Sequence, residues 1–258
     1  MKKQTALITG ASSGIGRALA LEFARHGWNL VLVARRSALL ATLATEIRDQ
    51  FAVEVSTIAF DLTASNAARA LFDEVSSRNL IIDCLVNNAG RGHFGDFADQ
   101  SWQVDEETLH LNVGVLTALC HVFAPGMIQR RQGYILNVAS IAGFVPGPKL
   151  AVYHATKAYV LSLSQALHAE FSPFQVGVTA SCPGPTQSEF FEKAGTQKLK
   201  ALSYMKLMPA ETVARQAYEA TMQRKPIVVH GLINRIMAES PRVMPKTWVA
   251  PLLKALMK

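Results

Sequence analysis

A glycine-rich turn near the start of the chain constrains the fold more than any other feature. An apolar run, residues 4–9, precedes this turn, and apolar residues at helical spacing follow it from Ile15 to Ala24. A strand, a glycine turn and a helix in this order are typical of a dinucleotide site, where glycines admit the pyrophosphate and the helix N-terminus favours an anion. The alternative is a structural turn that only opens a helix. We expect the dinucleotide to contact Gly10, Ser12, Ser13, Gly14, Ile15 and Gly16.

Two arginines at the end of the second apolar run, residues 29–34, indicate which dinucleotide is bound. A carboxylate at this place binds the 2′-hydroxyl of NAD, whereas arginine suits the 2′-phosphate of NADP. The sequence has Arg35 and Arg36 here and no nearby acidic residue. We therefore predict that NADP(H) is preferred over NAD(H). The alternative is that one or both arginines are solvated at the start of the next helix.

A tyrosine and a lysine one helical turn apart indicate proton-transfer chemistry. Residues 151–171 have a helical pattern, which puts Tyr153 and Lys157 on one face. A free tyrosine titrates near pH 10, and we expect the Lys157 ammonium to lower the pKa of Tyr153 towards the working pH. Ser140 ends the apolar run 134–139, where ligands of parallel sheets bind. Taken alone, the pair also fits a packed tyrosine beside a solvated lysine.

Further motifs, taken with these, resemble the short-chain dehydrogenase/reductase family in its shorter, single-domain form. The similarity extends over about residues 4–230. In family order, the chain carries the glycine turn, Asn87-Asn88-Ala89-Gly90 after the apolar run 82–86, Asn112, Ser140, Tyr153 with Lys157, and Pro183-Gly184.

The resemblance implies a role for each of these residues. Tyr153 is expected to be the general acid in carbonyl reduction and the base in alcohol oxidation, and Ser140 to position the substrate oxygen. Lys157 is expected to bind the nicotinamide ribose, and Asn112 to hold a water in a proton path. Asn87 is expected to bridge neighbouring strands. The remaining residues expected to contact the cofactor are Asp61, Leu62, Asn88, Ala89, Gly90, Pro183, Gly184 and Thr186.

Strand-like and helical runs alternate along the chain, which predicts an α/β fold. We expect a Rossmann-type, doubly wound parallel sheet in three layers, with helices on both faces. A length of 258 residues, half of them hydrophobic, suits a single NAD(P)-binding domain over residues 1–258. No uninterrupted apolar stretch reaches the roughly 20 residues that span a bilayer. The short run after Lys2-Lys3 is interpreted as a first strand and not as a signal peptide.

The cysteines, the histidines and the charge narrow the class of protein further. Cys84, Cys120 and Cys182 are odd in number and widely spaced, which favours buried thiols in a cytoplasmic protein. Seven histidines without metal-ligand spacing predict no metal site. The net charge of +7 suits an anionic dinucleotide in part. We expect no nucleic-acid binding, because the sequence has no dense basic cluster and no reading motif.

Two stretches downstream of the Pro-Gly pair bear on the substrate and on partners. Residues 186–208 mix aromatic and aliphatic side chains with lysines, and we expect them to form a mobile lid over a hydrophobic carbonyl or secondary alcohol. The tail, residues 230–258, is apolar with interspersed lysines and is expected to be broken into short helices by Pro241, Pro245 and Pro251. We expect it to cap the cleft or to contact a partner subunit in a homodimer or homotetramer. Peripheral membrane contact is the alternative.

Arg91 and His93 follow the Asn-Asn-Ala-Gly motif, where they either flank the entrance to the substrate site or lie in a solvated loop.

The sequence as a whole predicts an NADP(H)-dependent oxidoreductase that interconverts a carbonyl and a secondary alcohol on a small, hydrophobic substrate. One alternative is a catalytically silent dinucleotide sensor or scaffold with the same fold. A second is a nucleotide-sugar epimerase or dehydratase, but the relatives of that kind carry a different glycine spacing and a larger substrate domain.

Overall fold

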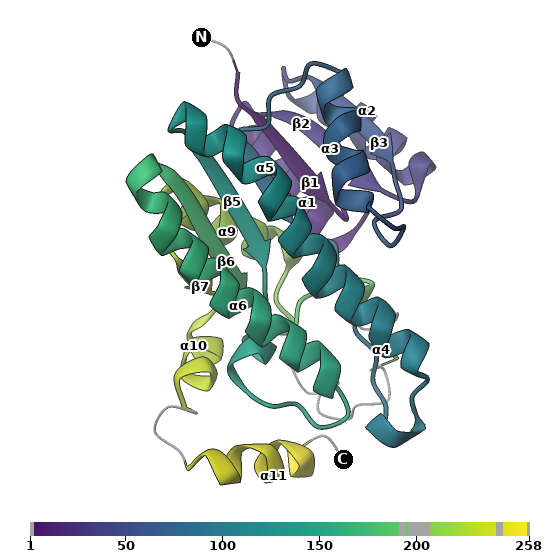
Figure 1. The fold of residues 1–258 in the computed structure, drawn as a ribbon, viewed down its shortest axis with the longest axis vertical. Coiled ribbons are helices and arrows are strands. Elements are labelled where there is room, and N and C mark those ends of the chain that lie inside the picture. Colours follow the sequence, from purple (N-terminus) through teal and green to yellow (C-terminus); the bar gives the residue numbers. More distant parts are fainter. Residues whose placement is uncertain (1–2, 191–193, 196–206, 241–244, 257–258) are drawn as a thin grey trace.

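A computed structural model describes residues 3–190, 194–195, 207–240 and 245–256. Within these residues, seven strands form one parallel sheet in the order β3-β2-β1-β4-β5-β6-β7 (Figure 1). The order reverses direction between β1 and β4, so this is the predicted doubly wound sheet. The strands are β1 (Thr5–Thr9), β2 (Asn29–Ala34), β3 (Val55–Ala59), β4 (Cys84–Asn87), β5 (Gly133–Val138), β6 (Val176–Cys182) and β7 (Ile227–Val229).

Helices cover both faces of the sheet, which confirms the three layers. The first face carries α3 (Ala67–Ser77), α5 (Leu116–Arg130) and α6 (Ala151–Phe171). The second carries α1 (Gly14–Arg25), α2 (Ser37–Gln50) and α9 (Ala210–Met222). The shorter elements are α4 (Trp102–Leu109), the π-helical turn η2 (His110–Val115) and the 3-10 turns η1 (Phe97–Asp99), η3 (Ile141–Phe144) and η4 (Ser172–Phe174).

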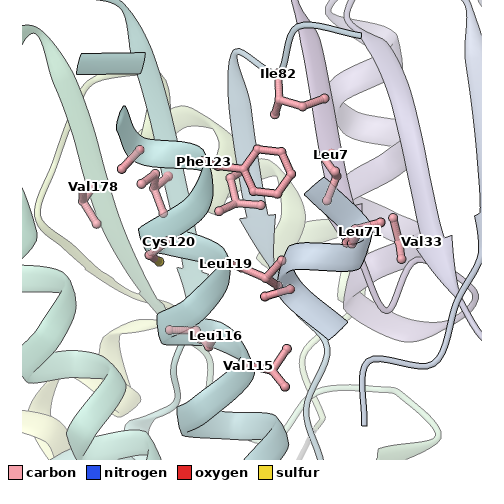
Figure 2. Close-up of a cluster of buried hydrophobic side chains, with 14 of the residues drawn as sticks. Leu7, Val33, Leu71, Ile82, Val115, Leu116, Leu119, Cys120, Phe123 and Val178 are labelled. Carbon is pink, nitrogen blue, oxygen red and sulfur yellow. The ribbon is translucent and has the colours of Figure 1, made fainter. Parts of the chain in front are cut away.

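Side chains along each strand alternate between two separate hydrophobic cores, one on each face of the sheet. Leu7 of β1 packs with α3 and α5 on the first face, and its neighbour Ile8 packs with α1 and α2 on the second. Figure 2 shows the first core, where Leu71 of α3 and Leu119 of α5 lie between the strands and the outer helices. Because both faces are buried, the strands are nearly continuous apolar runs, which is why they are visible in the sequence.

The elements α4, η2 and α5 form one continuous helix that is apolar on average. By length and composition, residues Trp102–Arg130 could cross a membrane, with a mean hydropathy of 1.6 in the best window. In the fold, however, α5 packs against α3 and β5. Its apolar side chains Leu116, Leu119, Phe123 and Met127 belong to the first core. The apolar composition of this helix is therefore used for internal packing.

The tail forms two helices, α10 (Leu232–Glu239) and α11 (Lys246–Leu256). The expectation that Pro251 would break the tail is wrong, because α11 continues through it. A proline removes a single helical hydrogen bond, here to the turn that opens the helix. Along α10, the side chains of Leu232, Ile233 and Ile236 are largely exposed. Pro241 and Met257 lie outside the described residues.

A buried histidine ties the end of β7 to β6 and α9 and makes stability depend on pH. The ring nitrogens of His230 lie 2.8 Å from Ser181 Oγ and 3.0 Å from Gln216 Oε1, and the residue is fully buried. Burial, aided by the charge of Arg235, lowers the pKa of His230 to about 4. The unfolded chain therefore takes up a proton first as the pH falls, and stability is lost between pH 6.5 and 4.

We expect His230 alone to reduce the free energy of unfolding by about 2 kcal/mol between pH 7.5 and pH 5. Urea unfolding of the wild type and of His230→Gln at both pH values measures this. The variant should lose less stability on acidification than the wild type. An equal loss in both proteins would show that His230 is not responsible.

Candidate active site

The glycine-rich turn lies between β1 and α1, at the point where the strand order reverses. Gly10 and Gly14 have φ angles of +65° and +53°, which residues other than glycine adopt only with strain. A Cβ on Gly16 would lie 2.3 Å from the carbonyl oxygen of Gly10, so helix and turn are in direct contact. The Asn88 side chain braces the turn from β4 by donating to the carbonyls of Thr9 and Gly10 at 2.9 and 3.2 Å. Sequence reasoning placed Asn88 along the cofactor but missed this bracing contact.

The adenosine end of the site gathers one arginine, two serines and an unforeseen carboxylate. Arg36 Nη2 donates to Ser12 Oγ at 3.0 Å and to Ser13 Oγ at 2.8 Å. The Glu189 carboxylate accepts from Ser13 Oγ at 3.2 Å and pairs with Arg36 Nη1 at 3.0 Å. Of the two predicted arginines, the structure thus brings Arg36 to the turn, while Arg35 is exposed.

Asp61 and Leu62 follow β3 at the same edge of the sheet. The Asp61 carboxylate accepts from the backbone and the hydroxyl of Thr63 at 2.9 and 2.7 Å. These hydrogen bonds lower the pKa of Asp61, and the charge of Arg35 adds to the effect. Leu62 is buried beside Asp61. Both residues therefore lie at the carboxyl end of β3, on the same edge of the sheet as the glycine turn.

Ser140, Tyr153 and Lys157 meet at the carboxyl end of β5. Ser140 begins the η3 turn, where its hydroxyl accepts from Ala142 N at 3.1 Å and donates to the Pro183 carbonyl at 3.4 Å. Lys157 Nζ lies 5.7 Å from the centre of the Tyr153 ring and donates to the Val138 carbonyl at 2.7 Å. The helix α6 was expected over residues 151–171, and its bounds are confirmed. The three predicted side chains are thus brought together from β5 and α6.

The predicted effect of Lys157 on the tyrosine is wrong for this structure. Burial raises the pKa of Tyr153 to about 12, and only the Ser140 hydrogen bond opposes it. Burial also lowers the pKa of Lys157 to about 8. The Lys157 ammonium lies 5.7 Å from the ring centre, and desolvation of the phenol has a larger effect on the pKa than the groups around it. Tyr153 is consequently a protonated phenol at neutral pH.

Asn112 lies in the π-helical turn η2 and is held by its neighbours. Its Oδ1 accepts from Arg91 N at 3.0 Å, and its Nδ2 donates to the Arg91 carbonyl at 2.8 Å and to Thr156 Oγ1 at 3.1 Å. Thr156 in turn donates to the Tyr153 carbonyl at 2.7 Å. Asn112 therefore joins the loop after β4 to the helix that carries Tyr153. A π-helical turn of this kind often marks a functional site.

Gly90, Ala89 and the Pro-Gly pair complete the edge of the site. A Cβ on Gly90 would lie 3.7 Å from Lys157 Nζ, and Ala89 N donates to Thr9 Oγ1 at 3.1 Å. After β6, Thr186 donates to the Gly184 carbonyl at 2.9 Å and pairs with Met208 in an isolated bridge. The carboxyl ends of β1, β4, β5 and β6 thus form one continuous edge of the candidate site.

Several other expectations can be compared with the structure. Asn87 Nδ2 donates to Asn137 Oδ1 at 2.9 Å, which confirms the bridge between β4 and β5. Arg91 forms an ion pair with Glu107, and His93 is exposed. All three cysteines are free and buried. Of the hydrophobic residues expected around the substrate, Phe190 packs against Tyr153 with 5.2 Å between ring centres, whereas Phe191, Leu199, Leu202, Tyr204 and Met205 lie outside the described residues.

A glycine turn at the reversal point of a doubly wound sheet, beside a tyrosine–lysine pair, is the arrangement found in dinucleotide-dependent oxidoreductases. The chain belongs to the short-chain dehydrogenase family, whose model matches residues 4–199.

Named relatives and a solved structure agree with this assignment. The chain is 38% identical over 169 residues to the very-long-chain 3-oxoacyl-CoA reductase of Laccaria bicolor, covering 64% of this chain and 49% of that protein. It is 30% identical over 246 residues to the Homo sapiens protein of the same name, covering 92% and 75%. This chain thus spans about half the length of the fungal relative. A short-chain dehydrogenase from Sphingobium yanoikuyae, solved in complex with NADPH, has a TM-score of 0.84 at 34% identity, covering 93% and 92% of the two chains.

Proposed function

We propose that this protein is an NADP(H)-dependent reductase of a ketone on a hydrophobic substrate, with Tyr153 as the proton donor. The observation that carries the proposal is the position of Tyr153. It lies between Ser140 and Lys157 at the carboxyl edge of the sheet, and Phe190 packs on its ring. Bound NADPH supplies the hydride.

The protonation states of the side chains suit proton donation to a carbonyl oxygen. With its pKa raised to about 12, Tyr153 holds its proton at neutral pH and can donate it to a carbonyl oxygen that gains negative charge. Ser140 is 9% exposed, and its hydroxyl can donate a hydrogen bond to the same oxygen. Lys157 is largely protonated at pH 7, so it can bind the nicotinamide ribose and stabilise the phenolate left on Tyr153. Asn112, through Thr156, positions the helix that carries both side chains.

The preference for NADP(H) is supported by Arg36. Its guanidinium and the hydroxyls of Ser12 and Ser13 form one cluster, and such donors suit a phosphate dianion better than a ribose hydroxyl. The related Sphingobium enzyme, solved with NADPH, agrees with this preference.

We expect Arg36→Leu to weaken binding of NADP⁺ about tenfold or more, because charge-assisted hydrogen bonds to the phosphate are lost. Binding of NAD⁺ should change little. Calorimetric titration of both dinucleotides into the wild type and the variant measures the difference. Arg78→Leu is the matched control, since Arg78 forms its ion pair with Glu74 on α3, away from the turn. A wild type that binds NAD⁺ more tightly than NADP⁺ would contradict the proposed preference.

The substrate we propose is a ketone attached to an apolar chain or ring system. The packing of the Phe190 ring against Tyr153 supports an apolar entrance to the substrate site. The two named relatives reduce 3-oxoacyl-CoA according to their names, so a 3-oxoacyl thioester is the first substrate to assay.

We further propose that the chain forms one domain and works as a homodimer or homotetramer. Light scattering of the intact chain measures the oligomeric state directly.

A further inference from the structure

The Glu189 carboxylate is bound to the same hydrogen-bond donors that would hold an anion at the adenosine end of the site. It accepts from Ser13 Oγ at 3.2 Å and forms an ion pair with Arg36 Nη1 at 3.0 Å. The same guanidinium donates through Nη2 to Ser12 and Ser13. A carboxylate from a distant part of the chain thus uses the groups that the proposed function assigns to the 2′-phosphate of NADP(H).

A phosphate and this carboxylate compete for these donors. Both groups accept hydrogen bonds and carry negative charge, so they repel each other at this distance. Binding of the 2′-phosphate is therefore opposed by the Glu189 carboxylate as long as it stays on Arg36 and Ser13. NAD(H) carries an uncharged hydroxyl in place of this phosphate, so it makes no such demand on the arginine.

We propose that Glu189 is an internal competitor for the 2′-phosphate and limits the preference for NADP(H) over NAD(H). The proposal rests on the proposed function in one respect, the assignment of Arg36 to the 2′-phosphate. It adds a residue that opposes this preference, where Arg36 favours it.

The course of the chain explains why Glu189 lies here and what else its displacement affects. The segment Thr186–Phe190 crosses the glycine turn so closely that a Cβ on Gly14 would lie 2.9 Å from Ser188 Cβ. At one end, Thr186 is fixed by its bridge to Met208. At the other end, Phe190 follows Glu189 directly and packs on Tyr153. Displacement of Glu189 therefore acts on the residue that covers the proposed proton donor.

The variant Glu189→Gln tests the proposal because it removes the charge and keeps the shape. We expect the dissociation constants of NADP⁺ and of 2′,5′-ADP to fall about two- to fivefold, the range for a half-exposed ion pair. The dissociation constant of NAD⁺ should change less, so the ratio between NAD⁺ and NADP⁺ should rise. The probe 2′,5′-ADP carries the 2′-phosphate without the nicotinamide, which separates this end of the site from the catalytic end.

Glu74→Gln is the matched control. It breaks the Arg78–Glu74 pair, whose side chains are 40% and 42% exposed, against 39% and 40% for the Arg36–Glu189 pair. It should leave all three dissociation constants unchanged at the same ionic strength. Unchanged or weaker binding of 2′,5′-ADP to Glu189→Gln would overturn the proposal, and weaker binding would identify Glu189 as a clamp. A wild type that prefers NAD⁺ would instead refute the cofactor preference, and the 2′,5′-ADP titration would still decide the role of Glu189.

Discussion

We expect Tyr153→Phe to lower kcat by about 10² to 10⁴-fold, the usual contribution of a positioned general acid, while the dissociation constant of NADPH stays near that of the wild type. The variant keeps the ring that packs against Phe190, so only the hydroxyl is removed. Without it, Ser140 can still donate a hydrogen bond to the carbonyl oxygen, but the proposed proton donor is gone. Steady-state rates with NADPH and a panel of ketones that includes 3-oxoacyl thioesters measure kcat. Quenching of protein fluorescence measures binding.

A second tyrosine on the same helix provides the control for this experiment. Tyr159 is 40% exposed, and its hydroxyl lies 3.0 Å from Thr117 Oγ1, outside the site. Tyr159→Phe should turn over substrate like the wild type. If Tyr153→Phe kept more than about a tenth of the wild-type rate, Tyr153 would not be the proton donor.

Gly16→Ala should have the second largest effect, on both binding and stability. The added methyl group would lie 2.3 Å from the Gly10 carbonyl oxygen and 2.4 Å from Asn88 Nδ2. The Gly10 backbone has little room to retreat, because Asn88 holds its carbonyl from β4. We expect dinucleotide binding to weaken about tenfold or more, since this glycine sets the close packing of helix and turn. The free energy of unfolding should fall by about 1–3 kcal/mol.

Gly114→Ala separates this steric effect from the general effect of alanine in a helix. Gly114 is also helical, but the nearest atom to an added Cβ is His110 Nδ1 at 3.7 Å. The alanine should therefore stabilise the protein slightly, by up to about 1 kcal/mol. Urea unfolding and calorimetric titration of both variants provide the comparison. Wild-type binding by Gly16→Ala would show that the turn does not hold the pyrophosphate.

The sequence predicts the fold well because buried parallel strands appear in it as short, continuous apolar runs. The bounds of β2 and α6 agree with the runs expected at 29–34 and 151–171. Each is an apolar or periodic segment with its limits marked by polar residues. The π-helical turn at Asn112 was not predicted, because a shift in hydrogen bonding leaves the side-chain pattern almost unchanged.

The site is predictable as far as its residues act through local motifs. Ser140, Tyr153 and Lys157 come together as expected because each lies at a strand end or on one helix face. Glu189 escaped prediction because it reaches Ser13 across 176 positions of the chain. The pKa of Tyr153 also escaped prediction. It depends on how deeply the phenol is buried, and spacing along a helix does not encode burial.

The place of β1 in the middle of the sheet has a consequence for synthesis on the ribosome. β1 pairs with β2 on one side and with β4 on the other, and β4 begins only at Cys84. Until that residue has emerged, the nascent chain presents β1 as an open strand edge with unpaired backbone groups. The Asn88 brace of the glycine turn is also missing at that stage. Chaperone protection during translation of the first 90 or so residues should therefore matter more for the yield of folded protein than protection of the later segments.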